Sequence, residues 1–429
     1  MCFRVAMLSL HTSPVAELGR TRNAGGMNVY VRELARELGR GGICVDIFTR
    51  RADPAAPPIQ SLDEQVRLIQ VPAGPATLLP PDELSPFVPE FTRRVARFAA
   101  RAPHGYDLIH SHYWLSGVAG LALARAWDVP HVTMYHTVER LKRQRAGAAA
   151  RRGAELADGA RVRVSAAARL RIEYERRIAL RADRITVSSE HEADQLRRLY
   201  GLPPCQLTIV PCGVDLRLFT LGSQRECAAM RGRLSPDGRP LLLFVGRLDP
   251  IKGIDLLLES VARMETAPRL IVVGGNPPHD PEVARLRACA EALGLGDRVS
   301  FPGAVPQREL PPYYRAAEAL VVTSRYESFG LVAVEALACG TPVVAARVGG
   351  LTSVLRHGEN GLLVCWRSPA AFAEQLDTLL MDERLRARLA RAARPSVARF
   401  DWRTIGDEVR ALYQELTAEQ RAVAACSCF

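Results

Sequence analysis

The segment 325–350 constrains the fold of this chain more than any other stretch. It reads RYESFGLVAVEALACGTPVVAARVGG. The apolar run 319–323 before it predicts a buried strand, and Gly330 opens an Ala-rich helix that Gly340 ends. A second buried strand follows at 343–346. A strand, a loop, a helix and a strand in this order are half of a parallel α/β unit, so the sequence predicts an α/β protein with doubly wound sheets.

Two glutamates flank the start of this helix. The unpaired N–H groups at a helix N-terminus attract phosphate. Glu327 in the loop and Glu335 inside the helix would repel phosphate, but their carboxylates can accept hydrogen bonds from hydroxyl groups. The combination indicates a ligand that carries both phosphates and hydroxyls, such as a nucleotide sugar.

Length and cysteine usage indicate a two-domain cytoplasmic protein. The chain has 429 residues, enough for two domains. No apolar run approaches the roughly 20 residues that span a bilayer, and the first residues, MCFRVAMLSLHTSP, predict a strand rather than a signal peptide. The ten cysteines show no C-x-x-C spacing, which favours reduced thiols.

The basic charge of the chain does not indicate nucleic-acid binding. The formal net charge is +11, but acidic residues lie between the arginines and aromatic residues do not interleave them. Only two of the 57 basic residues are lysines, Lys142 and Lys252. Because arginine and lysine are not interchangeable at a tight site, these two positions indicate a requirement for a compact ammonium group.

The rest of the chain repeats the α/β pattern. The predicted strands lie at 5–10, 45–49, 66–71, 107–110, 131–135, 185–188, 207–210, 241–245, 270–273 and 299–301. Residues 140–171 predict a mobile basic segment that runs into a helix at about 169–181. The stretch 211–215 resembles a hinge, and the last helix is expected from Trp402 to about Leu416. The predicted domains are 1–215, 216–399 and a final segment 400–429.

Three histidines and two basic residues follow predicted strands. The histidines at positions 110, 112 and 136 could suggest a metal, but no carboxylate or thiol has ligand spacing with them. The carboxyl ends of parallel strands are where substrate groups ordinarily lie. Arg247 and Lys252 offer two positive charges in one loop, which would stabilise negative charge on a leaving group.

Several strings identify a family resemblance over nearly the whole chain. They are HTSP, GGMNVYVRELA, DLIHSHYWLSG, GRLDPIKG, ESFGLVAVEALACGTPVVAARVGGL and ENGLLV. They resemble the retaining glycosyltransferases of family 4, and most of all the D-inositol 3-phosphate glycosyltransferases of mycothiol synthesis and the sucrose-phosphate synthases. The resemblance implies the GT-B fold: two Rossmann-like domains with a cleft between them and a C-terminal helix that crosses back onto the first domain.

The resemblance also implies site residues. The donor, a UDP-sugar carrying glucose or N-acetylglucosamine, would contact Gly26, Arg247, Lys252, Val305, Glu327, Phe329, Gly330, Leu331 and Glu335. His136, Arg247, Lys252 and Glu327 would serve catalysis. The acceptor, a small polyol or sugar that carries a phosphate in the related enzymes, would contact Asn28, Tyr113, Thr137, Lys142 and Arg171. One lysine of the related acceptor site is replaced here by Pro81, so the acceptor stays open.

The implied reaction needs no cofactor and no metal. The chain contains no Asp-x-Asp, the motif with which metal-dependent glycosyltransferases hold the diphosphate. The alternatives are a sucrose-phosphate synthase-like enzyme, a nucleotide-sugar epimerase or a phosphorylase on the same architecture, and a nucleotide-sugar sensor without turnover. A membrane surface that the basic segment 140–171 contacts and a second copy of the chain stay open as partners.

Overall fold

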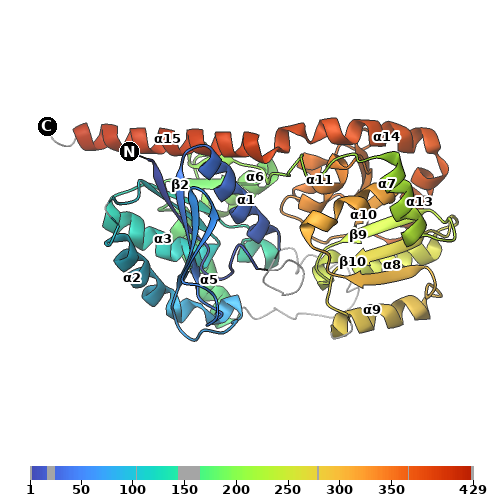
Figure 1. The fold of residues 1–429 in the computed structure, drawn as a ribbon, viewed down its shortest axis with the longest axis horizontal. Coiled ribbons are helices and arrows are strands. Elements are labelled where there is room, and N and C mark those ends of the chain that lie inside the picture. Colours follow the sequence, from blue (N-terminus) through green and yellow to red (C-terminus); the bar gives the residue numbers. More distant parts are fainter. Residues whose placement is uncertain are drawn as a thin grey trace. The chain divides into compact units, whose positions relative to one another are not determined.

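The protein consists of two compact units, each built on a parallel sheet (Figure 1). The computed structural model describes residues 2–16, 25–102, 104–143, 165–277, 280–365 and 367–426. The first unit comprises Met1–Val15, Met27–Val210 and Ile405–Phe429, and the second comprises Ala16–Gly26 and Pro211–Thr404. The chain therefore returns to the first unit with its last residues.

The first unit contains an eight-stranded sheet in the order β3-β4-β2-β1-β5-β6-β7-β8. Its strands are β1 (Arg4–Leu8), β2 (Cys44–Arg50), β3 (Ile59–Asp63), β4 (Val66–Val71), β5 (Leu108–His112), β6 (His131–Met134), β7 (Arg184–Val187) and β8 (Leu207–Ile209). Its helices are α1 (Gly26–Arg40), α2 (Val88–Ala99), α3 (Trp114–Trp127), α5 (Ala166–Ala179), α6 (Glu190–Tyr200) and α15 (Trp402–Cys426). All pairs are parallel except β3 with β4.

The second unit contains a six-stranded parallel sheet in the order β11-β10-β9-β12-β13-β14. Its strands are β9 (Leu241–Val245), β10 (Arg269–Val273), β11 (Val299–Gly303), β12 (Ala319–Val322), β13 (Val343–Ala346) and β14 (Gly361–Val364). Its helices are α7 (Gln224–Leu234), α8 (Ile254–Arg263), α9 (Pro281–Ala292), α10 (Pro311–Ala316), α11 (Leu331–Ala338), α12 (Leu351–Val354), α13 (Pro369–Met381) and α14 (Glu383–Ser396). The two units confirm the predicted fold class of two Rossmann-like, doubly wound domains.

Continuous apolar runs explain why the central strands of the second sheet are parallel and buried. Strands β5 and β6 of the first sheet are also buried throughout although they carry polar residues, whereas β12 and β13 are buried and apolar at every position. Strands that are covered on both faces by crossover helices carry such runs in place of alternation. In the second unit the two faces of the sheet have separate apolar clusters, one centred on α11 and the other on α8 and α13.

Two elements differ from the sequence prediction. Strand β3 was not predicted, because it is an exposed antiparallel edge strand without a buried face. The predicted end of the last helix near Leu416 is wrong, since α15 continues to Cys426. Among residues 402–422, whose side chains the structure describes, Leu416 is the last buried one, and Gln420 Nε2 donates a hydrogen bond to the carbonyl oxygen of Asp128 at 2.6 Å.

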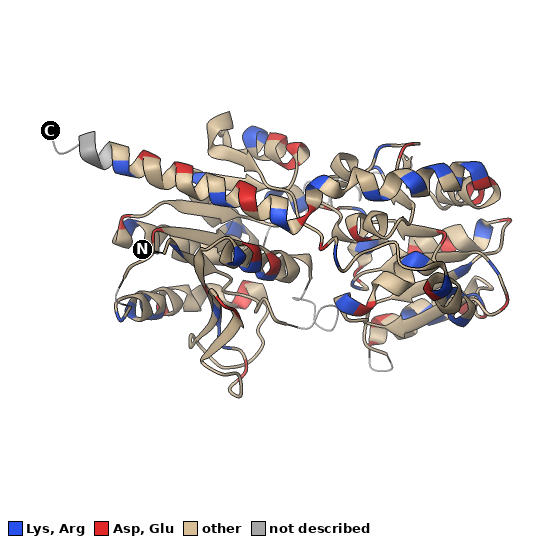
Figure 2. Ribbon diagram, turned by 45° about the horizontal axis from the view of Figure 1, so that its top comes forward, with Lys and Arg blue, Asp and Glu red and all other residues tan. Residues whose placement is uncertain are grey.

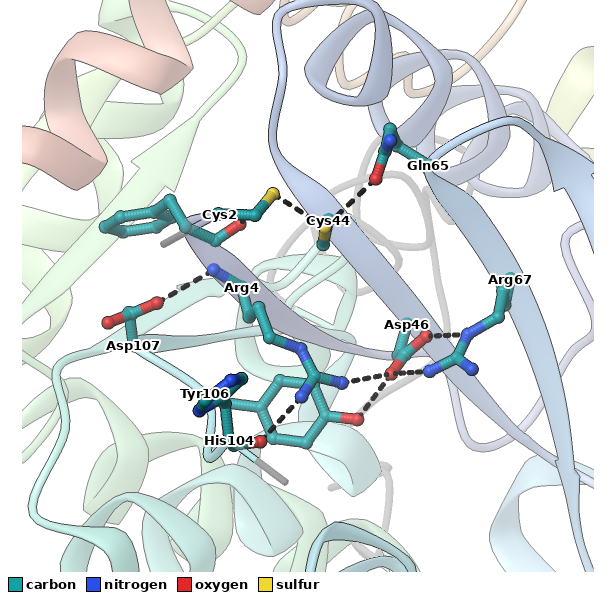
Figure 3. Close-up of polar contacts among 10 residues, drawn as sticks. Cys2, Arg4, Cys44, Asp46, Gln65, Arg67, His104, Tyr106 and Asp107 are labelled. Carbon is teal, nitrogen blue, oxygen red and sulfur yellow. Dashed lines mark hydrogen bonds and ion pairs between the residues drawn. The ribbon is translucent and has the colours of Figure 1, made fainter. Parts of the chain in front are cut away.

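Asp46 organises the amino-terminal edge of the first sheet (Figure 3). Its buried carboxylate accepts hydrogen bonds from Arg4 NH2 at 3.2 Å, from Arg67 Nε and NH2 at 2.7 Å each, and from the hydroxyl of Tyr106 at 2.6 Å. Two guanidinium groups thus compensate one buried carboxylate, as burial of a charge requires. Asp46 acts as a structural anchor at the end of the sheet opposite to the carboxyl ends of its strands.

The thiols next to this anchor are free. Eight cysteines among the described residues have no disulfide partner. Cys2 Sγ lies 2.6 Å from Cys44 Sγ, and the amide of Cys44 donates to the carbonyl oxygen of Phe3 at 2.8 Å. The start of the chain is therefore fixed against β2 by backbone hydrogen bonding.

Charged residues of both signs are mixed over the surface. Figure 2 shows basic and acidic residues interspersed along the helices of both units, including α15. Among the described helices, none combines the length and the apolar composition needed to cross a bilayer.

Candidate active site

The predicted strand, loop, helix and strand around residues 325–350 are present as β12, the loop 323–330, α11 and β13. Gly330 caps α11 with a φ of 103°. This left-handed conformation is costly for residues with a side chain. It allows the chain to turn directly from the loop into the helix. The amides of Ala333 and Val334 donate to the carbonyl oxygen of Gly330 at 2.9 and 3.2 Å, which leaves those of Leu331 and Val332 as the first amides without an intrahelical acceptor.

Lys252 and Glu327 form an ion pair in the second unit. Lys252 Nζ lies 2.7 Å from Glu327 Oε2, and the two side chains are 21% and 15% exposed. Ser324 Oγ lies 3.3 Å from the same carboxylate oxygen. Lys252 ends a short 3-10 turn after β9, and Glu327 lies in the loop after the neighbouring strand β12. Residues 75 positions apart are therefore joined because parallel neighbours end at the same edge of the sheet.

Two glycines hold the loop that carries Glu327. The amide of Gly350 donates to the carbonyl oxygen of Glu327 at 2.9 Å. A Cβ at Gly349 would lie 2.1 Å from the same carbonyl oxygen, and one at Gly350 would lie 2.0 Å from the carbonyl oxygen of Ser328. Real Cβ atoms do not approach other atoms so closely, so only glycine at both positions allows this backbone contact.

Glu335 lies buried inside α11, with 3% of its surface exposed. Gln307 Nε2 donates to Oε1 and the hydroxyl of Tyr314 donates to Oε2, each at 2.7 Å. Burial raises the pKa of Glu335 to about 7. The two donors fix the orientation of the carboxylate, and each oxygen keeps a further lone pair for another hydrogen bond.

The raised pKa of Glu335 predicts a pH-dependent stability. Its pKa is about 7 in the folded protein and near 4.5 in the unfolded chain, so the folded state binds more protons between these values. Stability is then fully present below pH 4.5 and decreases as pH rises through 7. Between pH 4.5 and 7 the thermal midpoint of Glu335→Gln should therefore fall by at least about 2 °C less than that of the wild type. The control Glu374→Gln, an exposed position on α13, should keep the wild-type slope; an unchanged slope in Glu335→Gln would contradict the assignment.

Three other predicted donor-side residues, Arg247, Val305 and Phe329, lie in the second unit in different surroundings. Arg247 and Val305 are half-buried in the loops after β9 and β11. The side chain of Phe329 is buried and packs edge-on against Phe400 with ring centroids 5.3 Å apart, so only its backbone is available to a ligand. Gly26 begins α1, and no atom lies within 4 Å of the position of a Cβ there.

In the first unit, His136 lies after β6 next to His112 at the end of β5. His112 Nδ1 and His136 Nε2 are 3.1 Å apart, so one ring nitrogen donates and the other accepts. Burial lowers the pKa of His136 to about 3, which keeps the imidazole neutral near pH 7. Both His136 and Tyr113 have positive φ angles, 58° and 74°. Such strained non-glycine residues are concentrated at functional sites.

Arg171 contacts two other predicted acceptor-side residues, Tyr113 and Thr137. NH1 donates to the hydroxyl of Tyr113 at 2.9 Å, and NH2 donates to the carbonyl oxygen and Oγ1 of Thr137 at 3.0 and 3.1 Å. Nε donates to Glu175 Oε1 at 2.7 Å, and NH1 lies 3.3 Å from Glu139 Oε2. Burial raises the pKa of Glu175 to about 7. The cluster places Tyr113, Thr137 and Arg171 together at the carboxyl ends of β5 and β6.

Asn28 and Lys142 are the other two predicted acceptor-side residues. Asn28 Nδ2 donates to Thr12 Oγ1 at 2.8 Å and to the carbonyl oxygen of Ser13 at 2.6 Å. Lys142 is exposed in the helical segment 139–143. Most of the basic segment that was expected to be mobile, residues 144–164, lies outside the described residues, and the helix after it is observed at 166–179.

Sequence reasoning missed the residues that support the site. Gly349 and Gly350 belong to a sequence motif, but no sequence pattern links them to the loop of Glu327 or links Gln307 and Tyr314 to Glu335. Glu175 could have been found, because residues four apart on a helix face each other and Arg171 precedes it by four. No group of three or more His, Cys, Asp or Glu residues suited to a metal ion is present in the described part of the chain.

Comparisons with known proteins show which family the chain resembles. The family model described as glycosyl transferases group 1 matches residues 228–395, and that of glycosyltransferase family 4 matches residues 24–218. A D-inositol 3-phosphate glycosyltransferase of Xylanimonas cellulosilytica is 42% identical over 424 residues, covering 98% of both chains. One of Acidothermus cellulolyticus is also 42% identical, over 98% of this chain and 92% of the relative.

A solved structure shows the same fold over nearly the full length. Sucrose-phosphate synthase from Thermosynechococcus elongatus is 34% identical, with a TM-score of 0.86 and coverage of 97% of this chain and all of the other. Together with the two family models, which match most of the chain, this similarity establishes the family. The chain belongs to glycosyltransferase family 4 and is a glycosyltransferase with the GT-B fold.

Proposed function

We propose that this enzyme transfers a hexosyl group from a UDP-sugar to a small phosphorylated polyol, with retention of the anomeric configuration and without a metal ion. The observation that carries the proposal is the ion pair between Lys252 Nζ and Glu327 Oε2 at 2.7 Å. Both side chains lie in adjacent loops of one unit, where the ammonium would bind the diphosphate and the carboxylate would accept hydrogen bonds from the sugar. The relatives named as D-inositol 3-phosphate glycosyltransferases support the choice of acceptor.

On binding, the UDP-sugar would break the ion pair between Lys252 and Glu327 and would contact both side chains itself. The diphosphate takes Lys252, together with Arg247, and a sugar hydroxyl donates to the carboxylate of Glu327. Glu335, already oriented by two donors, accepts hydrogen bonds from the ribose hydroxyls, and the backbone near Val305 contacts the uracil. As the glycosidic bond breaks, negative charge grows on the β-phosphate, and the two fixed cations stabilise that charge more than they stabilise the ground state.

The acceptor step needs no protein nucleophile. The acceptor hydroxyl attacks the anomeric carbon on the face that the UDP leaves, and the departing phosphate oxygen takes the hydroxyl proton. His136 cannot serve as a general acid near pH 7, because its buried imidazole is neutral. It can hold a sugar hydroxyl by a hydrogen bond, while His112 fixes its ring.

A UDP-release assay tests this function. We expect release from UDP-N-acetylglucosamine or UDP-glucose only when 1D-myo-inositol 3-phosphate is present, and no effect of added chelator. Release without dependence on inositol phosphate would overturn the proposed acceptor. Fructose 6-phosphate is the comparator, since the sucrose-phosphate synthase is 34% identical at a TM-score of 0.86. Faster UDP release with fructose 6-phosphate would assign a sucrose-phosphate synthase-like function instead.

A further inference from the structure

Arg171 has no unused hydrogen-bond donor in this structure. A guanidinium group has five N–H donors. Glu175 takes Nε–H, Tyr113 takes one hydrogen of NH1, and the backbone and side chain of Thr137 take NH2. The second hydrogen of NH1 is left for Glu139, whose Oε2 lies 3.3 Å from NH1. An anionic group of the acceptor can therefore reach Arg171 only if one of these partners gives way.

Glu139 is the partner that is held least firmly. Its contact with Arg171 is the longest of the five. Its other carboxylate oxygen accepts a hydrogen bond from Arg143 Nε at 2.7 Å, so Glu139 keeps a cation after it leaves Arg171. Glu175, by contrast, is fully buried, and its carboxylate also accepts the backbone amide of residue 139.

We propose that Glu139 competes with the anionic group of the acceptor for Arg171 and thereby sets the selectivity for phosphorylated acceptors. The inference rests on the proposed function, because it takes the acceptor to carry a phosphate. In the free enzyme the carboxylate of Glu139 occupies NH1 of Arg171. A neutral polyol does not displace it and therefore gains no binding free energy from Arg171. Only a ligand with a stronger negative charge displaces Glu139, and the displaced carboxylate stays paired with Arg143.

Glu139→Gln tests the competition. The amide keeps the size of the side chain and the backbone contact of residue 139, but it removes the charge that pairs with Arg171. We expect 1D-myo-inositol 3-phosphate to bind Glu139→Gln about five- to tenfold more tightly than the wild type in isothermal titration calorimetry. The affinity for myo-inositol should not change. Glu173→Gln removes a charge from an exposed position of the same helix as Arg171 and should behave as the wild type.

Each outcome decides the inference. Equal affinity of wild type and Glu139→Gln for the phosphorylated ligand would overturn it, and so would an equal gain for myo-inositol, which would indicate a steric effect. Inorganic phosphate, titrated in parallel, separates the inference from the proposed acceptor. If inositol phosphate supports no transfer but inorganic phosphate binds Glu139→Gln more tightly, the acceptor assignment fails and the competition stands. If phosphate binds both proteins equally, the competition fails.

Discussion

Lys252→Ala should lower kcat for sugar transfer by about 10²–10³-fold, the usual effect of removing one fixed donor to a developing negative charge. The ammonium of Lys252 lies on the short turn after β9, 2.7 Å from the Glu327 carboxylate. Its loss removes a positive charge from the leaving diphosphate and also leaves Glu327 without its cation. Steady-state UDP release with both substrates varied measures the effect, which should fall mainly on kcat.

Two comparisons make this result specific. Lys252→Arg should recover little activity, because the planar guanidinium cannot replace a compact ammonium at the same distance from Glu327. Arg263→Ala removes a half-exposed cation from α8 of the same unit and is the matched control, expected to be near the wild type. Glu327→Ala should abolish transfer as well. Activity of Lys252→Ala within threefold of the wild type would refute the role of Lys252 as a diphosphate ligand.

Gly350→Ala should reduce kcat/KM by about 100-fold while the protein stays folded, because misplacing a positioning group by about 1 Å costs that much. The new Cβ would lie 2.0 Å from the carbonyl oxygen of Ser328 and 2.7 Å from the Cα of Phe329. The loop must therefore move away, and the carboxylate of Glu327 moves with it. Kinetics together with circular dichroism and the thermal midpoint measure both properties.

Gly232→Ala is the matched control for this substitution. Gly232 lies in α7, and no atom lies within 4 Å of its Cβ position. Alanine there should leave activity unchanged and stabilise the protein slightly, by about 0.5–1 kcal/mol. If Gly350→Ala transfers sugar at the wild-type rate, the contact between residues 350 and 327 does not position the catalytic loop.

The sequence predicted the sheets well because both are buried on two faces. Runs such as Leu241–Val245 and Val343–Ala346 have no alternation to misread, and the structure has them at the predicted bounds. The exposed edge strand β3 lacked such a run. The same reasoning applies to α15, because none of its residues 417–422 is buried, and Gln420 there makes a polar contact with Asp128.

The internal partners of the site residues could not be predicted. Lys252 and Glu327 are 75 positions apart, and no spacing rule joins them. Only the topology, which places β9 beside β12, brings their loops together. Arg171 was expected to contact the acceptor, whereas in the structure all its donors are occupied by other residues. The residue type indicates the chemistry, but the occupancy of each donor depends on tertiary packing.

The return of the chain to its first unit has a consequence for its synthesis. The hydroxyl of Tyr413 lies 2.6 Å from Nδ1 of His110 on the central strand β5, although 303 positions separate them. At about 5–20 residues per second, a ribosome needs on the order of 15–60 s between these two residues. Throughout that interval Nδ1 of the buried His110 lacks this hydrogen-bond partner. The first unit therefore completes this buried contact only after the second unit has been synthesised. A chain that terminates before Tyr413 would lack the contact permanently.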